Sequence, residues 1–159
     1  MNSMKIRGKY KWELVRDGKV IWTEEQENLI VNAGLDYFLG VGLSDETPDG
    51  THYVGLKDTG TAVAADTLAS HASWAELTNY TGDRKEWVEA GVSSQNITNS
   101  ASPASFTFTS ADTIYGSFLC SAASGTSGTL ISVSDFSASR AVLTDDVLNC
   151  TYTITAADA

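Results

Sequence analysis

One pattern near the N-terminus restricts the fold more than any other feature of this chain. From residue 5 to residue 14, charged side chains alternate with apolar or small ones, which places the charges on one face of an extended strand. The charged face holds Lys5, Arg7, Lys9, Lys11 and Glu13, and the other face holds Ile6, Gly8, Tyr10, Trp12 and Leu14. Asp17-Gly18 follows, and both residues tolerate the positive φ of a two-residue hairpin turn. The sequence therefore predicts a β-hairpin over about residues 4–31.

The rest of the chain also has the character of short strands. Near the C-terminus, Leu148, Cys150, Tyr152 and Ile154 alternate with polar residues, mostly threonine, as in a half-buried strand. Further strands are predicted around residues 53–56, 74–80, 86–92, 106–108, 114–119 and 130–133. About eight short strands at nearly regular spacing indicate an all-β fold, a β-sandwich or jelly roll. We find no internal repeat or long linker, so a single domain over residues 1–159 is expected.

One or two short helices are expected beside these strands. Asn32 precedes an apolar run that begins at Leu35, and it is predicted to cap a helix of about two turns. Residues 66–71 are predicted to form a single helical turn.

The net charge of −10 is unevenly distributed along the chain. Six of the ten basic residues lie within the first twenty positions. Acidic proteins are poorly suited to nucleic acid, because duplex binding depends on neutralising phosphates. The basic N-terminal strand suits an acidic partner surface, so Lys5, Arg7, Lys9 and Lys11 are the candidate partner-binding residues. The alternative is that these four side chains only form a solvated strand face.

Targeting and membrane signals are not found in the sequence. There is no run of about 18 apolar residues, and the N-terminal residues lack the apolar stretch of a signal peptide. We therefore expect a soluble protein that is made in the cytoplasm and does not bind membranes.

The polar residues do not form a pattern that predicts catalysis or metal binding. His52 and His71 belong to no zinc motif, and no serine lies in the G-x-S-x-G turn of a hydrolase. The acidic pairs Asp45-Glu46 and Asp145-Asp146 lack the ligand spacing of a calcium loop. We expect no enzyme activity, no metal and no cofactor. The alternative, that the protein is an enzyme, would require a turnover that is lost when His52 or His71 is changed.

Different roles are expected for the two cysteines and for the four tryptophans. Cys120 and Cys150 lie in apolar strand phase, so free and unreactive thiols are expected, although the sequence does not show whether their strands are neighbours. Trp12 and Trp22 occupy strand positions whose side chains are expected to face the core. Trp74, Tyr80 and Trp87 are the candidates for exposed aromatic contacts, for example with a sugar.

Several segments together resemble a family of small virion structural proteins of tailed bacteriophages. The segments cover most of the chain in order: residues 28–36 (NLIVNAGLD), 53–56 (YVGL), 65–74 (ADTLASHASW), 99–106 (NSASPASF) and 148–154 (LNCTYTI). The resemblance implies a role in the phage particle and carries over no catalytic residue.

Within that family, the implied role is that of a capsid decoration (cement) protein. Such a protein is made in the host cytoplasm, assembles as a homo-oligomer, preferably a trimer, and binds the major capsid protein on the capsid exterior. Two alternatives stay open: a tail or fibre-associated component, and a glycan- or receptor-binding module that uses exposed aromatic side chains.

Overall fold

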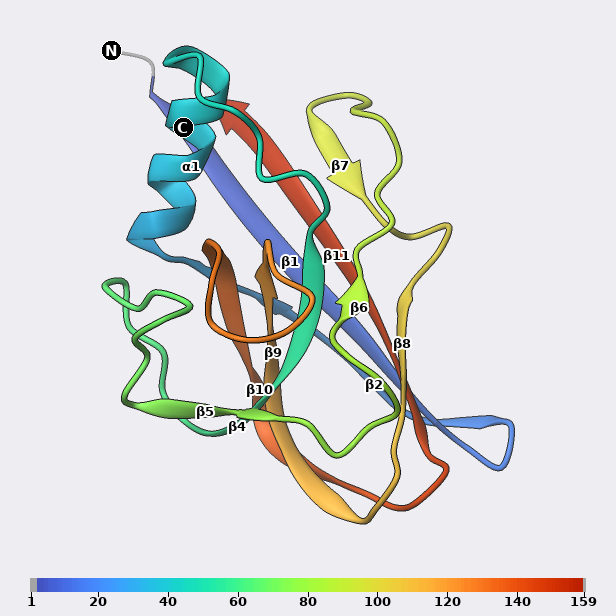
Figure 1. The fold of residues 1–159 in the computed structure, drawn as a ribbon. Coiled ribbons are helices and arrows are strands. Elements are labelled where there is room, and N and C mark those ends of the chain that lie inside the picture. Colours follow the sequence, from blue (N-terminus) through green and yellow to red (C-terminus); the bar gives the residue numbers. More distant parts are fainter. Residues whose placement is uncertain (1–2, 159) are drawn as a thin grey trace.

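The computed structural model describes residues 3–158, which form two antiparallel β-sheets and one α-helix. The two sheets pack face to face, and the helix lies at one end of them (Figure 1). The predicted all-β sandwich is confirmed. Residues 3–158 contain eleven strands, several of only two to four residues, where the sequence predicted about eight.

The first sheet, sheet A, contains both terminal strands of the described chain. Its strand order is β2-β1-β11-β7, and β8 also pairs with β11. The bounds are β1 (Met4–Arg16), β2 (Lys19–Glu27), β7 (Asn96–Thr98), β8 (Ala104–Thr107) and β11 (Val147–Asp158). β1 pairs with β11 in one unbroken register from Met4↔Asp158 to Val15↔Val147, so β1 is an interior strand.

The second sheet, sheet B, has the strand order β3-β10-β9-β4-β5, and β6 also pairs with β4. Its strands are β3 (Leu29–Ile30), β4 (Tyr53–Gly60), β5 (Trp74–Leu77), β6 (Lys85–Glu86), β9 (Asp112–Cys120) and β10 (Leu130–Val142). The strand predicted over residues 86–92 is wrong beyond Glu86, because the following chain leaves the sheet and crosses the end of the sandwich.

The N-terminal hairpin forms where the alternation predicts it. Asp17 and Gly18 have φ values of 50° and 74°, which are the positive values of a two-residue turn. The hairpin ends at Glu27, however, and Leu29 and Ile30 pair with β10 of sheet B. Asn28 makes this change of sheet possible, since its N–H donates to Gly8 O and its side chain donates to Tyr152 Oη.

The core between the sheets is rich in aromatic side chains. Tyr10 stacks on Trp12 and on Tyr152, with ring centroids 5.5 Å and 4.2 Å apart. Their polar atoms reach the opposite sheet: Tyr10 Oη lies 2.9 Å from Ser132 Oγ, and Trp12 Nε1 donates to Ser117 Oγ at 2.9 Å. The core therefore buries large apolar surfaces without leaving these groups unpaired.

A second apolar cluster lies on the outer side of sheet B. It includes Leu68, Trp74 and Phe118, which are covered by the connection between β4 and β5. Residues 66–71 were predicted as a helical turn, but this segment is a tight turn closed by a Thr67↔Ser70 bridge. The Asp66 carboxylate explains the difference, because it accepts hydrogen bonds from Val63 N and Trp74 Nε1 and so ties the segment to the cluster.

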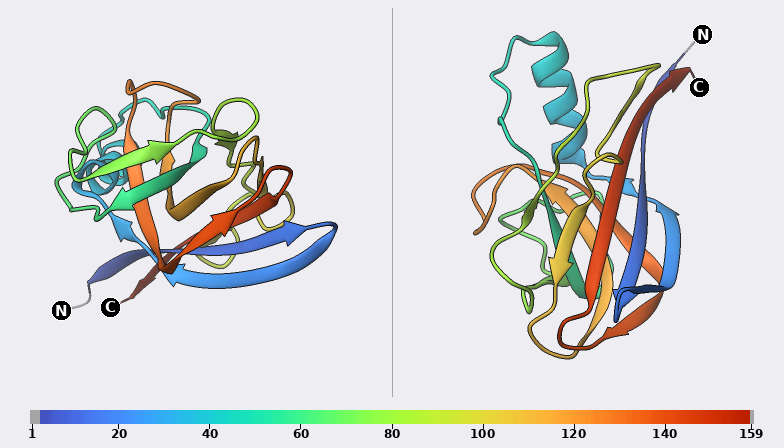
Figure 2. Two further views of the ribbon diagram at one scale, coloured as in Figure 1. Left: turned by 90° about the horizontal axis from the view of Figure 1, so that it is seen from below. Right: turned by 90° about the vertical axis from the view of Figure 1, so that its right-hand side faces the viewer.

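Helix α1 (Asn32–Leu43) is longer than the predicted two turns. The predicted cap at Asn32 is wrong: the N-cap residue is Val31, and no side chain caps the helix. Tertiary hydrogen bonds set the helix start instead, from Val31 N to Ile131 O and from Asn32 N to Ala64 O. In the right-hand view of Figure 2, the helix projects from the same end of the sandwich as the start of β1 and the end of β11.

No helix in residues 3–158 combines the length and apolar character needed to cross a membrane.

Gly8 makes room for a buried aromatic side chain and gives the first testable prediction. A Cβ atom at this position would lie 2.2 Å from Tyr152 Oη and 2.3 Å from Asn28 Oδ1. Gly8→Ala should therefore lower the free energy of unfolding by about 1–3 kcal/mol, measured by urea denaturation. In the control Gly42→Ala, the new methyl group meets no atom within 4 Å and improves helix propensity, so stability should not fall. Equal stability of Gly8→Ala and the native protein would contradict the packing described for β1.

Asp146 lies at the end of the sandwich opposite helix α1. There it joins the turn that follows β1 to the turn between β10 and β11. Its buried carboxylate accepts hydrogen bonds from Arg16 Nε at 2.8 Å, from Arg16 Nη2 at 2.6 Å and from Leu143 N at 2.8 Å. The hydrogen bonds from Arg16 are the main reason that the pKa of Asp146 lies below its ordinary value.

Asp146→Asn should lower the melting temperature at neutral pH. Because the folded-state pKa is depressed, the stabilisation exists above the unfolded pKa of about 3.9 and disappears as the pH falls through the folded pKa. The difference from the native protein should thus shrink in acid, as measured by thermal melts across pH 2–7. The exposed neighbour Asp145→Asn should change little at any pH, and a pH-independent difference for Asp146→Asn would contradict the assignment.

Candidate functional site

The four predicted partner-binding cations lie in one row on the outer face of sheet A. Lys5, Arg7, Lys9 and Lys11 are exposed, whereas the intervening Gly8, Tyr10 and Trp12 are buried against the other sheet. We call these four side chains the basic row. The whole row lies on a strand that pairs with β11, and β2 flanks this strand from Lys9 onward.

The neighbouring strands give the basic row an acidic side and a neutral side. On β2, Glu27 lies opposite Lys9 and Glu25 lies opposite Lys11. On β11, the residues opposite Arg7, Lys9 and Lys11 are all threonines: Thr155, Thr153 and Thr151. The outer face of sheet A is thus a polar surface with charges of both signs at one margin.

Ion pairing divides the basic row into two halves. Lys9 Nζ lies 3.0 Å from Glu25 Oε2, and Lys11 Nζ lies 3.4 Å from Glu13 Oε1. Lys5 and Arg7 form no ion pair with any residue in the range 3–158. The two cations without an ion-pair partner in the described chain therefore lie toward the Met4 end of β1.

The three aromatic residues predicted to be exposed are buried. Trp74 is 6% exposed, Tyr80 is 5% exposed and Trp87 is 4% exposed. Trp74 stacks on His71 and donates to Asp66, Tyr80 packs on Phe106, and Trp87 Nε1 donates to Tyr152 O. The prediction of exposed aromatic contacts is wrong for this reason. These side chains offer no open ring face on which a sugar can stack.

The two cysteines are free and buried, as predicted. Burial raises the pKa of Cys150 to about 12 and also raises the pKa of Cys120 above its ordinary value. Such thiols stay protonated at neutral pH and are weak nucleophiles. Residues 3–158 contain no group of three or more His, Cys, Asp or Glu side chains that could hold a metal ion.

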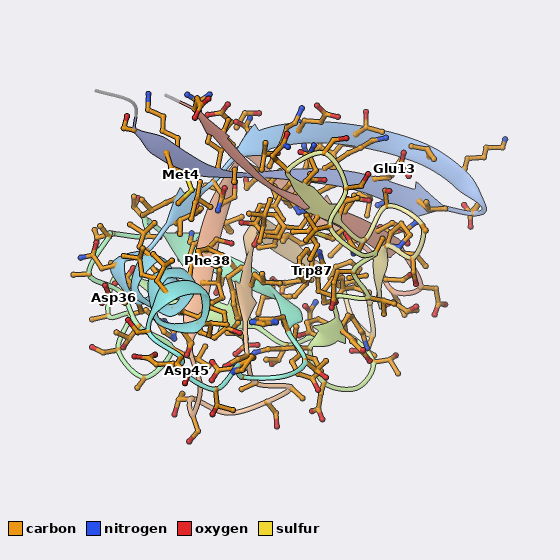
Figure 3. All side chains as sticks on the ribbon, turned by 90° about the horizontal axis from the view of Figure 1, so that it is seen from above. Met4, Glu13, Asp36, Phe38, Asp45 and Trp87 are labelled. Atoms are coloured by element: carbon orange, nitrogen blue, oxygen red, sulfur yellow. The ribbon has the colours of Figure 1, made fainter. Side chains whose placement is uncertain are left out.

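A half-enclosed pocket lies at the end of the sandwich where α1 projects, and the sequence did not predict it. Its volume is about 190 Å³, and both sheets contribute to its floor. The floor consists of Ile97, Leu119, Ile131 and Ile154, and the wall residues are Tyr37, Phe38, Gly50, His52, Trp87 and Glu89. We call it the end pocket. Figure 3 looks onto this end and shows Phe38 of α1 on one side and Trp87 on the other.

Backbone hydrogen bonds hold the walls of the end pocket in place. Trp87 N donates to His52 O at 2.8 Å, which fixes the tryptophan beside the start of β4. Asp49 N donates to Tyr37 Oη at 3.3 Å, which holds the loop after α1 above the tyrosine. The His52 ring lies almost perpendicular to Tyr37 and to Trp87, with centroid distances of 5.5 Å and 6.4 Å. Edge-to-face arrangements of this kind are favourable for aromatic rings.

Two titratable groups that line the end pocket have shifted pKa values: burial raises the pKa of Tyr37, and the pKa of His52 is lowered. Burial lowers its pKa below the ordinary value, and the nearby carboxylates of Asp49 and Glu89 partly offset this effect. The imidazole is therefore neutral at pH 7, and the charge at the mouth of the pocket comes from the carboxylates.

Comparison of the sequence with protein-family models and with curated proteins finds no match.

The environment of His52 leads to a prediction for its titration. Proton NMR of the imidazole should give a midpoint below the unfolded value of about 6.5, and Asp49→Asn should lower that midpoint further by removing a favourable charge. The linked stability has the same sign as that of Asp146, because both folded-state pKa values are lowered: it is fully present above pH 6.5 and declines as the pH falls below it. A midpoint at or above 6.5 would contradict the burial of His52.

Proposed function

We propose that this chain is a structural protein of a tailed-bacteriophage particle, and specifically a capsid decoration protein. In this role it binds the major capsid protein on the exterior of the shell and stabilises the shell without catalysing a reaction. The basic row supports the proposal most directly, because it presents cations on one strand of an otherwise acidic protein. The resemblance of the sequence to phage virion proteins supplies the biological context.

Docking through the outer face of sheet A follows from its charged and polar side chains. Lys5 and Arg7 attract carboxylates of the shell, and no ion pair within residues 3–158 has to break first. The threonines of β11 lie beside the cations and offer hydroxyl groups for hydrogen bonds to the same partner. An exposed β-face that carries several cations suits contact with an acidic protein surface.

Repetition on the particle strengthens such contacts. A homo-oligomer, preferably a trimer, presents several basic rows together, and linked binding events gain affinity from their high effective concentration. Interfaces of modest area are then sufficient for stable attachment. The buried thiols with raised pKa agree with a structural rather than a catalytic role.

The glycan-binding alternative loses its main support. It relied on exposed Trp74, Tyr80 and Trp87, and all three side chains are buried. A tail or fibre-associated role shares the same fold, so the two locations in the virion have to be distinguished directly.

Capsid occupancy tests the proposed docking surface. Undecorated capsids are mixed with the purified protein, and bound copies are counted by quantitative gel analysis. Changing Lys5, Arg7, Lys9 and Lys11 to serine should reduce the apparent affinity by about tenfold or more, because each oligomer loses several attractive contacts. Lys5→Ser/Arg7→Ser should account for most of the loss, since Lys9 and Lys11 are already paired within the chain.

Two controls complete this experiment. Lys19→Ser removes an exposed cation of β2 outside the basic row and should leave occupancy unchanged. Electron microscopy with a labelled antibody should place the protein on the head of the virion. Undiminished occupancy of the fourfold variant rejects the docking surface, and label on the tail or no label on the virion rejects the decoration role.

A further inference from the structure

The end pocket has an apolar interior that no side chain of the described chain fills. Its floor is formed by Leu119 and Ile131 of sheet B and by Ile97 and Ile154 of sheet A, so the pocket is the open end of the space between the sheets. Protein interiors are normally close-packed, and apolar cavities in them attract apolar groups. The interior therefore selects for an apolar ligand.

The volume limits the ligand to one compact group. A cavity of about 150 Å³ lined by apolar side chains accommodates a benzene molecule. The end pocket, at about 190 Å³, holds a single aromatic ring or a branched aliphatic chain. It is too small for a nucleotide or an oligosaccharide.

The mouth of the pocket is negatively charged. Every charged residue in the two segments that border it, residues 31–52 and 86–98, is acidic: Asp36, Asp45, Glu46, Asp49, Glu86 and Glu89. Glu89 lines the pocket itself, and Asp49 and Glu89 both act on the His52 imidazole. Figure 3 shows Asp36 on the side of α1 away from Trp87, so the charge at the mouth itself comes from Asp49 and Glu89. A positive charge at the mouth is thus favoured over a negative one.

The aromatic walls favour the same ligand charge. Tyr37, Phe38 and Trp87 border the space from two sides, and aromatic faces attract cations through their quadrupoles. Tyr37 and Phe38 are partly exposed and offer ring surface against which an aromatic ligand packs well.

We propose that the end pocket binds an apolar organic cation, which is a single aromatic or branched aliphatic group with a positive charge close to it. The apolar group occupies the space between the sheets, and the charge lies at the mouth near Asp49 and Glu89. Two sources supply this chemistry: a free arylalkylamine, or a large apolar side chain flanked by lysine or arginine in another polypeptide. The site is separate from the basic row and does not depend on the proposed capsid role.

NMR titration of the full chain tests this proposal with two probes of similar size and opposite charge. The probes are 2-phenylethylammonium and 3-phenylpropionate, and the reporter is the indole N–H of Trp87, which donates to Tyr152 O beside the pocket. The cation should shift this resonance saturably and bind about tenfold tighter or more than the anion, since two carboxylates lie at the mouth. Absence of saturable binding by the cation, or equal affinities for both probes, overturns the proposal.

Charge variants separate binding at this site from general attraction to an acidic protein. Asp49→Asn/Glu89→Gln should remove most of the preference for the cation while the phenyl group still binds. The control Asp17→Asn/Asp145→Asn removes two charges from turns at the opposite end of the sandwich and should leave the preference intact. An equal loss in both double variants overturns the proposal, because it would mean that only the net charge matters.

A peptide arm distinguishes the two sources of the ligand. Acetyl-Lys-Phe-Lys-amide and acetyl-Glu-Phe-Glu-amide carry the same phenyl group with flanking charges of opposite sign. Tighter binding of the lysine peptide than of free 2-phenylethylammonium identifies a polypeptide partner. Binding of the free amine alone identifies a small-molecule ligand.

Discussion

The sandwich depends on an aromatic layer whose polar atoms are satisfied by the opposite sheet. Tyr10 and Trp12 extend from β1 into the core, and their hydroxyl and indole groups meet Ser132 and Ser117 of sheet B. Leaving such a buried group unpaired costs about 1–3 kcal/mol, so these contacts fix how the two sheets lie relative to each other. The same strand presents the basic row on its other side. The core contacts of Tyr10 and Trp12 therefore also hold the stretch of backbone from which Lys9 and Lys11 extend.

The two candidate surfaces differ in charge and in construction. The basic row belongs to one strand, and its geometry follows from the pleat of a single sheet. The end pocket exists only because α1, the start of β4, the segment around Trp87 and both sheets meet at one end. Opposite charges on separate surfaces give the molecule a polarity that orients it during encounters with charged partners.

How far the sequence predicted the structure depends on the range of the interactions involved. The hairpin turn and the exposure of the basic row follow from alternation and from Asp17-Gly18, which act over a few residues. The burial of Trp74 and Trp87 depends on contacts with distant segments, to Asp66 and to the carbonyl of Tyr152. The start of α1 is likewise set by hydrogen bonds to Ile131 and Ala64. The end pocket left no local pattern at all, because its walls are contributed by separate parts of the chain.

The unbroken pairing of β1 with β11 has a consequence for how the protein is made. β1 leaves the ribosome long before its partner strand β11, because most of the described chain separates the two. Until then, β1 has a fully apolar face and an unpaired edge, and it must not aggregate. Non-local pairing of this kind also slows folding. The alternating cations of β1 repel neighbouring nascent chains during this delay. The same lysines and arginine thus protect the chain before it folds.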